Sequence, residues 1–483
     1  MTDAERLTTS DVFNPGQFPR YTYRSREVEE TAVLKWWRDR GQILVVHGPS
    51  KTGKTVLMQK LLDDTDPIWI DGHGLESTDV MWARIADQLG LFTNVSRGSG
   101  EGDERSTNLE IKAGVSSTGI ATNPTYTETV EKSLTYSVDR PVELVVKEAL
   151  QLTERPLVID DIHFVSTEAQ KQIIQALKPL IFGNTKVPGR RVVFVSIGNR
   201  VINVLTNLDD MRDRMLPLPM QYWDQTDLEQ IAKDGFVKLR FVDADGSLSS
   251  KLAGQSFGSP HLMQQLCREL CSGEPNNLLH EAPDPTELEP PISWETFFKA
   301  QLLDDVGRWI TKLAKGPDPR GTKRDLTPTK SGRMVDAYQL LLLVMASTGP
   351  RLELTKDEIQ VALNEVSNKV PPFKSVPTQT LSNLSLIAAT KLLDKLPSLA
   401  DLRARRDAGF DPYAQADLQP VLEYRDTGAT SSLTITDPFF AFYLAWGLED
   451  ALDAINATSG APTEDIAPAV DPQVEEDEWG NLV

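Results

Sequence analysis

The sequence predicts an α/β protein in which a parallel sheet surrounds a glycine loop, followed by a helical region and a small C-terminal module. Residues 48–55 read GPSKTGKT, which matches the pattern G-x-x-x-x-G-K-[ST]. An apolar run from Ile43 to Val46 precedes the loop, and a helix-like segment from Val56 to Leu62 follows it. Strand-like and helix-like segments then alternate as far as residue 199. This alternation is typical of a parallel sheet with crossover helices.

The glycine loop has the chemistry of a phosphate-binding loop. Its backbone N–H groups and the N-terminus of the following helix would face the phosphates of a nucleotide. Lys54 would reach the β- and γ-phosphates, and Thr55 would be a ligand of Mg²⁺. A chance match in a Gly/Ser turn is the alternative, and the strand before and helix after disfavour it. The expected nucleotide contacts in the loop are Gly48, Pro49, Ser50, Lys51, Thr52, Gly53, Lys54, Thr55 and Val56.

The predicted core covers residues 21–222, after a polar leader at 1–20. Helices are expected at 21–38, 54–63, 79–89, 142–152 and 167–180, and strands at 42–47, 67–71, 157–161 and 191–199. Residues 95–140 interrupt this core and are rich in Gly, Ser, Thr and charge. Within them, 109–115 and 134–138 alternate at period two, which indicates a β-hairpin-like insertion. It is either a solvated surface loop or a hairpin that contacts a partner or a polymer.

Three further segments follow the core. Residues 223–314 read as a helical lid with a linker, and a second, locally basic linker covers 315–333. Residues 334–450 predict helices at 334–346, 355–366 and 378–396, then a hairpin of 421–424 with 432–435, the order of a winged helix. Its third helix carries only Lys391 and Lys395, so a structural or regulatory role is favoured over DNA reading. Residues 451–483 are small, polar and acidic, and we expect them to be disordered.

Two acids end the apolar strand at 157–161. Asp160 fits the carboxylate on the Mg²⁺ side of the nucleotide, and Asp161 falls where an acid can orient the attacking water. The alternative is a solvated turn. Asn199 ends the next strand and is either a γ-phosphate ligand or a turn residue. Arg212 and Arg214 follow, either as arginines that complete a neighbouring subunit's site or as surface charges near Asp209, Asp210 and Asp213.

Together these residues resemble the additional-strand P-loop ATPases, specifically the AAA+ and STAND groups. The segment Tyr23-Arg24-Ser25-Arg26-Glu27 resembles a box that precedes the phosphate loop, and the resemblance implies adenine contacts by Tyr23 and Arg26. Ser25 stands where that box has glycine. The resemblance also rests on the double aspartate and on Asn199 followed by Arg212 and Arg214. It rests further on Gly258-Ser259-Pro260, where the resemblance implies that Pro260 packs near the base of the nucleotide, and on Asp437-Pro438-Phe439.

Composition limits the remaining classes. The 483-residue chain has a formal net charge of −20, which disfavours broad nucleic-acid coating. No apolar stretch approaches the length of a membrane span, and the N-terminus lacks signal-peptide features. The two cysteines, Cys267 and Cys271, read as reduced core thiols of a cytoplasmic protein.

The resemblance implies ATP and Mg²⁺ as cofactors and a homo-oligomer as the working form. The leading expectation is an ATP-dependent oligomeric switch or scaffold that acts with a separate effector or sensor protein, in a setting such as prokaryotic antiphage defence. A DNA-transaction AAA+ ATPase (initiator, loader or transposition regulator) is the alternative, supported by the winged helix and the basic linker. A third reading is a nucleotide-binding assembly protein with negligible turnover.

Overall fold

The computed structural model describes residues 6–39, 41–95, 109–112, 141–182, 189–198, 200–206, 208, 211, 214–318, 324–409, 420–426 and 431–459. The chain divides into two compact units. Residues 28–47 and 57–218 form the sheet unit, and residues 1–27, 48–56 and 219–483 form the lid unit. The chain therefore passes between the units several times.

The sheet unit contains the predicted sheet, in the order β2-β5-β6-β1-β7. β2 pairs parallel with β5, and β5 pairs parallel with β6. All four residues from Ile43 to Val46 are fully buried, as an apolar run in a covered sheet should be. These strands confirm the α/β prediction. Their bounds are β1 (Ile43–Gly48), β2 (Ile68–Asp71), β5 (Leu157–Asp160), β6 (Val192–Ile197) and β7 (Met215–Pro219).

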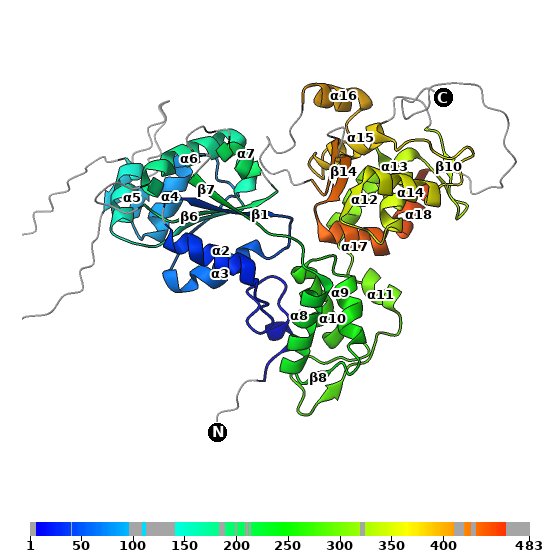
Figure 1. Ribbon diagram of the computed structural model, residues 1–483, viewed down its shortest axis with the longest axis horizontal. Helices are drawn as coiled ribbons and strands as arrows, with labels where there is room; N and C mark the ends of the chain where they lie inside the picture. The colour runs from blue at the N-terminus through cyan, green and yellow to red at the C-terminus, as the bar shows by residue number, and fades with distance from the viewer. Residues whose placement is uncertain are drawn as a thin grey trace, which may run out of the picture. The chain divides into compact units, whose positions relative to one another are not determined.

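Helices cover both faces of this sheet. Figure 1 shows α2 on one face and α4, α5 and α6 on the other. Trp82 of α4 packs in the core together with residues of the strands, and Trp36 of α2 is buried as well. The bounds are α2 (Glu27–Arg38), α3 (Lys54–Leu62), α4 (Thr78–Gln88), α5 (Val142–Gln151), α6 (Thr167–Phe182) and α7 (Arg200–Thr206).

The hairpin prediction for residues 95–140 can be followed only at 109–112. β4 (Leu109–Lys112) is a strand, as the period-two alternation predicted, but it pairs antiparallel with β3 (Phe92–Val95). Residues 134–138, which show the same alternation, lie outside the described residues, so their part of the prediction stays a prediction. β3 was missed because its four residues lie at the end of a predicted helix-to-loop boundary.

The helical part of the lid unit follows β7. Its bounds are α8 (Gln225–Lys238), β8 (Phe241–Val242), α9 (Ser247–Gly254), α10 (Pro260–Ser272), β9 (Thr286–Glu287), α11 (Trp294–Lys299) and α12 (Asp304–Lys315). α11 and α12 are separate helices, and Leu303, the N-cap residue of α12, has an extended conformation.

The N-terminal segment is more than a polar leader. It contains α1 (Thr9–Val12), which is closed by a capping box between Thr8 and Asp11. Val12 and Phe13 are fully buried, and the Phe13 ring lies edge-on to Phe236 of α8, with ring centroids 5.6 Å apart. The segment is thus a packed part of the lid unit.

The C-terminal module has the element order predicted for a winged helix. β12, β14 and β13 form a three-stranded antiparallel sheet beside three helices. Its bounds are β10 (Thr327–Pro328), β11 (Met334–Val335), α13 (Ala337–Ser347), β12 (Glu353–Thr355), α14 (Lys356–Val366), α15 (Thr378–Ala388), α16 (Leu399–Asp407), β13 (Leu422–Asp426), β14 (Ser431–Ile435), α17 (Pro438–Trp446) and α18 (Leu448–Ser459).

Two boundaries in this module differ from the prediction. The third helix ends at Ala388, so Lys391 and Lys395 lie beyond it. The chain remains helical through Ser459 instead of becoming disordered at 451. Leu452 in this last helix is fully buried, because the small and apolar residues after Trp446 form one more amphipathic face.

Candidate nucleotide-binding site

The phosphate loop connects β1 to α3 through three left-handed residues. Gly48 has φ +147°, Lys51 has φ +60° and Gly53 has φ +89°. At Gly48, a Cβ atom would lie 2.1 Å from the carbonyl oxygen of Met220. Glycine is therefore required there both by conformation and by space. The helix begins at Lys54, as the motif predicts.

Lys54 is held within its own loop. The side chain is 6% exposed, and its Nζ donates hydrogen bonds to the carbonyl oxygens of Gly48 at 3.2 Å and Pro49 at 2.5 Å. Thr52 Oγ1 also donates to the Pro49 carbonyl, at 3.0 Å. A buried ammonium beside a helix N-terminus makes this loop a favourable place for an anion.

The remaining loop residues have mixed exposure. Ser50 and Thr52 are buried, and Lys51 is exposed. Gly53, Thr55 and Val56 are partly buried. The loop thus combines a buried scaffold with accessible backbone.

Two side chains from the helical lid hold the loop from outside. Trp223 Nε1 donates a hydrogen bond to the Thr52 carbonyl at 2.9 Å. Ser259 Oγ donates to the Lys51 carbonyl at 3.4 Å. Sequence reasoning did not single out either contact, because Trp223 lies in no motif and Ser259 was noted only as the neighbour of Pro260.

The residues expected near adenine are arranged around the same lid segment. The Arg26 guanidinium lies 4.4 Å from the centroid of the Trp223 ring, and its Nη2 donates to the Gln221 carbonyl at 2.8 Å. Tyr23 stacks on Phe18, with ring centroids 5.6 Å apart. The structure therefore brings Arg26 against the segment that contacts the loop.

Pro260 occupies the first turn of α10, directly after the N-cap residue Ser259. The next residue, His261, is partly buried. Burial lowers the pKa of His261 to about 4, and the charges of Lys51 and Arg268 add to this effect. A neutral imidazole thus stands beside the loop at neutral pH.

The two acids of the sheet unit lie at the carboxyl end of β5. Asp160 is 8% exposed, and its Oδ1 accepts a hydrogen bond from the Asp161 N–H at 2.9 Å. Asp161 has φ +50°, in the left-handed region. Gly72 follows the neighbouring strand β2, and a Cβ atom there would lie 2.3 Å from the Asp161 carbonyl oxygen. This close approach fixes the backbone that carries both acids.

His163 is a site residue that sequence reasoning missed. It is 4% exposed, and its Nδ1 lies 3.8 Å from Asp161 Oδ1. The Ile197 N–H, at the end of β6, points at the same Nδ1 at 3.4 Å. His163 therefore joins the segment after β5 to the end of the neighbouring strand β6, although His163 and Ile197 are 34 residues apart in sequence.

The remaining predicted catalytic residues are only partly visible. Asn199 and Arg212 lie outside the described residues. Arg214 is exposed, and its guanidinium lies 4.2 Å from the centroid of the Phe182 ring. Such a cation–π contact holds the side chain at the surface of the sheet unit.

No group of three His, Cys, Asp or Glu side chains in the described ranges is arranged to hold a metal ion. Mg²⁺ at nucleotide sites needs few protein ligands, because waters and phosphates complete its octahedral shell. The Thr55 hydroxyl and the Asp160 carboxylate are of the ligand type that Mg²⁺ prefers. Thr55 lies in the lid unit and Asp160 in the sheet unit, so Mg²⁺ binding by the two together stays a prediction.

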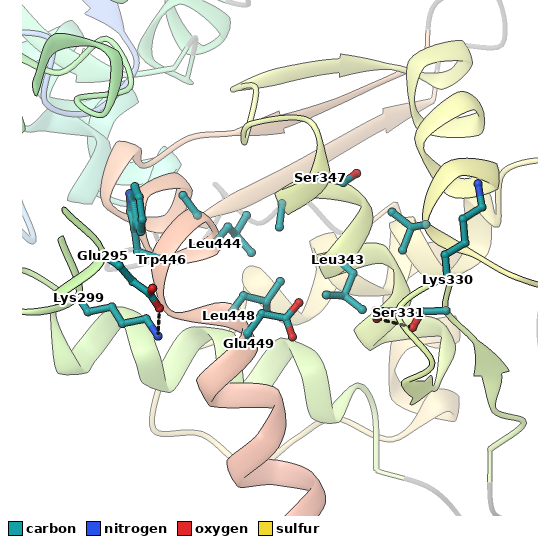
Figure 2. A pocket seen from close by; sticks show the side chains of 14 residues that line it. Glu295, Lys299, Lys330, Ser331, Leu343, Ser347, Leu444, Trp446, Leu448 and Glu449 are labelled. Atoms are coloured by element: carbon teal, nitrogen blue, oxygen red, sulfur yellow. Dashed lines mark hydrogen bonds and ion pairs between the residues drawn. The ribbon is translucent and has the colours of Figure 1, made fainter. Parts of the chain in front are cut away.

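A separate pocket of about 500 Å³ lies in the lid unit, among α11, α13, α17 and α18 (Figure 2). Three charged side chains of its lining, Glu295, Lys299 and Glu449, form ion pairs. Lys299 contacts Glu295 at 3.0 Å and Asp450 at 2.9 Å, and Glu449 contacts Arg333 at 2.7 Å. We assign no ligand to this pocket.

The strand order defines the class of fold. β6 lies between β1, which leads into the phosphate loop, and β5, which ends in Asp160. An extra strand between these two, together with the loop, makes this the fold of the additional-strand P-loop ATPases, which include the AAA+ and STAND groups.

No helix among the described residues is long and apolar enough to cross a membrane.

Several solved structures are similar to this chain. The ORC2 protein of Aeropyrum pernix, in ADPNP–ADP complexes, has 10% identity and a TM-score of 0.41, over 92% of this chain and 98% of that chain. A Walker-type ATPase of Pyrococcus abyssi has 11% identity and a TM-score of 0.43, over 89% and 97%. A STAND protein with a tetratricopeptide repeat sensor from Pyrococcus horikoshii has 13% identity and a TM-score of 0.31, over 76% and 45%.

No protein-family model matches the sequence, and no curated protein matches it. The function proposed below therefore rests on this chain's own residues.

Proposed function

We propose that the protein binds ATP with Mg²⁺, hydrolyses it slowly, and acts as an oligomeric switch or scaffold that regulates a partner protein. The observation that carries this proposal is Lys54, a nearly buried cation at the start of α3, in a loop whose glycines take left-handed conformations. In the structure this ammonium donates to the carbonyl oxygens of Gly48 and Pro49, which keep it inside the loop. The β- and γ-phosphates of a nucleotide would replace these contacts with stronger, charge-assisted ones.

Each residue has a role in this proposal. The loop amides from Gly48 to Val56 bind phosphate, and Thr55 with Asp160 holds Mg²⁺. Asp161 orients the attacking water, and its short side chain is the reason for slow turnover. Arg26 and Pro260 lie on the adenine side, together with Tyr23. Asn199 contacts the γ-phosphate.

Arg212 and Arg214 complete the site of a neighbouring copy. An arginine supplied from another subunit stabilises charge in the transition state. Self-association with ATP is therefore part of the function, and a separate effector or sensor protein receives the signal. Prokaryotic antiphage defence is a setting in which such cytoplasmic switches act.

A DNA-transaction ATPase is the second candidate. Three arginines on α16, Arg403, Arg405 and Arg406, favour it. The basic linker at 315–333 supports DNA binding less than its composition predicted, because two of its arginines are in ion pairs. Arg324 pairs with Asp336 at 2.7 Å, and Arg333 pairs with Glu449 at 2.7 Å and Asp453 at 2.9 Å. Steeply salt-dependent binding to duplex DNA would support this candidate over the switch.

The Lys54→Ala variant tests ATP binding. Titration calorimetry with ATP and Mg²⁺ should show a loss of affinity of about 100-fold or more, since a charge-assisted contact to each of two phosphates is removed. Lys60→Ala is the matched control, because Lys60 lies exposed on the same helix. Equal affinity in the wild type and Lys54→Ala would contradict the proposal.

A further inference from the structure

Two consecutive residues in the lid unit contact different parts of the molecule. The Trp223 indole N–H donates to the phosphate loop at Thr52, as described above. The preceding residue, Tyr222, donates from its hydroxyl to the Ile435 carbonyl at 3.2 Å. Ile435 is the last residue of β14 in the C-terminal module. The dipeptide 222–223 therefore joins the phosphate loop to the wing hairpin.

The contact with Trp223 has a consequence for phosphate binding. In a planar trans peptide, the carbonyl of one residue and the N–H of the next point in opposite directions. Holding the Thr52 carbonyl toward Trp223 therefore directs the Gly53 N–H to the opposite side. Ser259, which holds the Lys51 carbonyl, directs the Thr52 N–H in the same way. These are amides that would bind phosphate.

The segment that carries Tyr222 and Trp223 packs closely on Gly258. The Trp223 N–H donates to the Gly258 carbonyl at 3.0 Å. Gly258 has φ +70°, and a Cβ atom there would lie 2.7 Å from Tyr222 Cβ. Because both residues share this close packing, we expect a displacement of one side chain to shift the other.

Further contacts connect the same two regions. The rings of His261 and Phe439 lie edge to face, with centroids 5.5 Å apart. Asp437, at the N-cap of α17, is partly buried. Burial raises its pKa, while the hydrogen bond from the Phe439 N–H and the charge of Lys51 oppose that shift. The start of α17 is therefore close to the phosphate loop as well as to the lid.

We propose that Trp223 and Ser259 are positioning residues for the phosphate loop, and that Tyr222 couples the orientation of that loop to docking of the C-terminal module. This inference rests on the proposed function. Docking of β14 and α17 favours the loop conformation that binds phosphate. By linkage, ATP binding must then strengthen the docking by the same factor.

The test compares Trp223→Phe, which removes the indole donor, with Tyr222→Phe, which removes only a hydroxyl with no contact to the loop. ATP affinity should fall about 3- to 10-fold in Trp223→Phe, as expected for one hydrogen bond. It should fall about 2- to 5-fold in Tyr222→Phe. Tyr338→Phe is the matched control, because its hydroxyl accepts a hydrogen bond from Asn383 inside the C-terminal module. It should leave ATP affinity unchanged.

Amide hydrogen exchange gives a second readout that does not depend on affinity. In the wild type, ATP should slow exchange in residues 431–446, and Tyr222→Phe should abolish that change. Thermal midpoints of all variants identify any that fail to fold. The double variant should lose less affinity than the two single losses combined.

The outcomes separate the two levels of the proposal. A folded wild type that binds no ATP overturns the proposed function. Wild-type binding that Tyr222→Phe leaves unchanged, with no effect of ATP on exchange in 431–446, overturns the coupling alone.

Discussion

The loops that follow β1 and β5 both contain left-handed backbone, but different residue types adopt it. Both strands are apolar and buried, and both run into a loop that carries functional side chains. In the loop after β1, two of the three residues with left-handed φ angles are glycines, Gly48 and Gly53. In the loop after β5, the left-handed residue is Asp161. That conformation costs a non-glycine residue about 1 kcal/mol or more.

The two ends also differ in what holds them. The acid end is fixed by its neighbours in the sheet unit, through the Asp161 N–H on Asp160 and the close approach of Gly72. The phosphate loop is held by Trp223 and Ser259, which lie far along the chain. The acid end is thus shaped by the sheet, whereas the phosphate loop depends on the lid.

The largest expected effect is at Gly48. Gly48→Ala places a methyl group on the Met220 carbonyl, which should destabilise the fold by about 2–4 kcal/mol and abolish ATP binding. Gly53→Ala is the control, because no atom lies within 4 Å of its added Cβ and only backbone strain remains. Denaturant unfolding and calorimetry measure both. Equal losses of stability in the two variants would show that backbone strain, not space, sets the requirement at Gly48.

The acid end should respond in the opposite sense. Asp161→Gly relieves the left-handed strain and should raise stability by up to about 1 kcal/mol, less the extra chain entropy that glycine loses on folding. Phosphate release should slow by about 10- to 100-fold, because the water-orienting carboxylate is gone. ATP affinity should stay near the wild-type value.

Asp160→Ala provides the contrast for this variant. It should weaken Mg²⁺-dependent ATP binding as well as hydrolysis, since the metal loses a ligand. If Asp160→Ala and Asp161→Gly lose the same ATP affinity, the two acids do not divide their roles as proposed.

The smallest expected effect is a pH dependence on the lid side of the phosphate loop. The pKa of His261 is about 4 in the folded chain, below its ordinary value of 6.5. Between these values the unfolded chain binds a proton that the folded chain does not, so stability should fall as the pH drops from about 6.5 to 4. His261→Asn should reduce the slope of the unfolding free energy against pH, by up to the contribution of about one bound proton. Urea unfolding at pH 7 and pH 5 measures it, and an unchanged slope would contradict the assignment.

Local sequence patterns were sufficient to predict several strands, the start of α3 and the two acids. β1, β5 and β6 were predictable because runs such as Ile43 to Val46 are continuously apolar and end at Gly or Asp. The start of α3 at Lys54 followed from the loop motif. Asp160 and Asp161 were predictable because acids directly follow a buried strand.

Long-range contacts left no such signal. Nothing in the sequence near Trp223 shows that its indole meets Thr52, and His163 reads as an ordinary turn residue. β4 showed its alternation, but register between distant strands is set by tertiary packing, so β3 was missed as its partner. The helix at α18 was missed because low hydrophobicity and acidic charge resemble a disordered tail, while Leu452 supplies enough burial to order it.

The contact between Trp223 and Thr52 also bears on how the protein is made. The two residues are 171 positions apart, and a ribosome adding about 5–20 residues per second needs roughly 10 to 30 seconds to cover that distance. The glycine loop leaves the ribosome early but acquires its external support only after the lid has been synthesised. A nascent chain that stalls before residue 223 would therefore carry the complete nucleotide motif without the side chain that sets the direction of its amides.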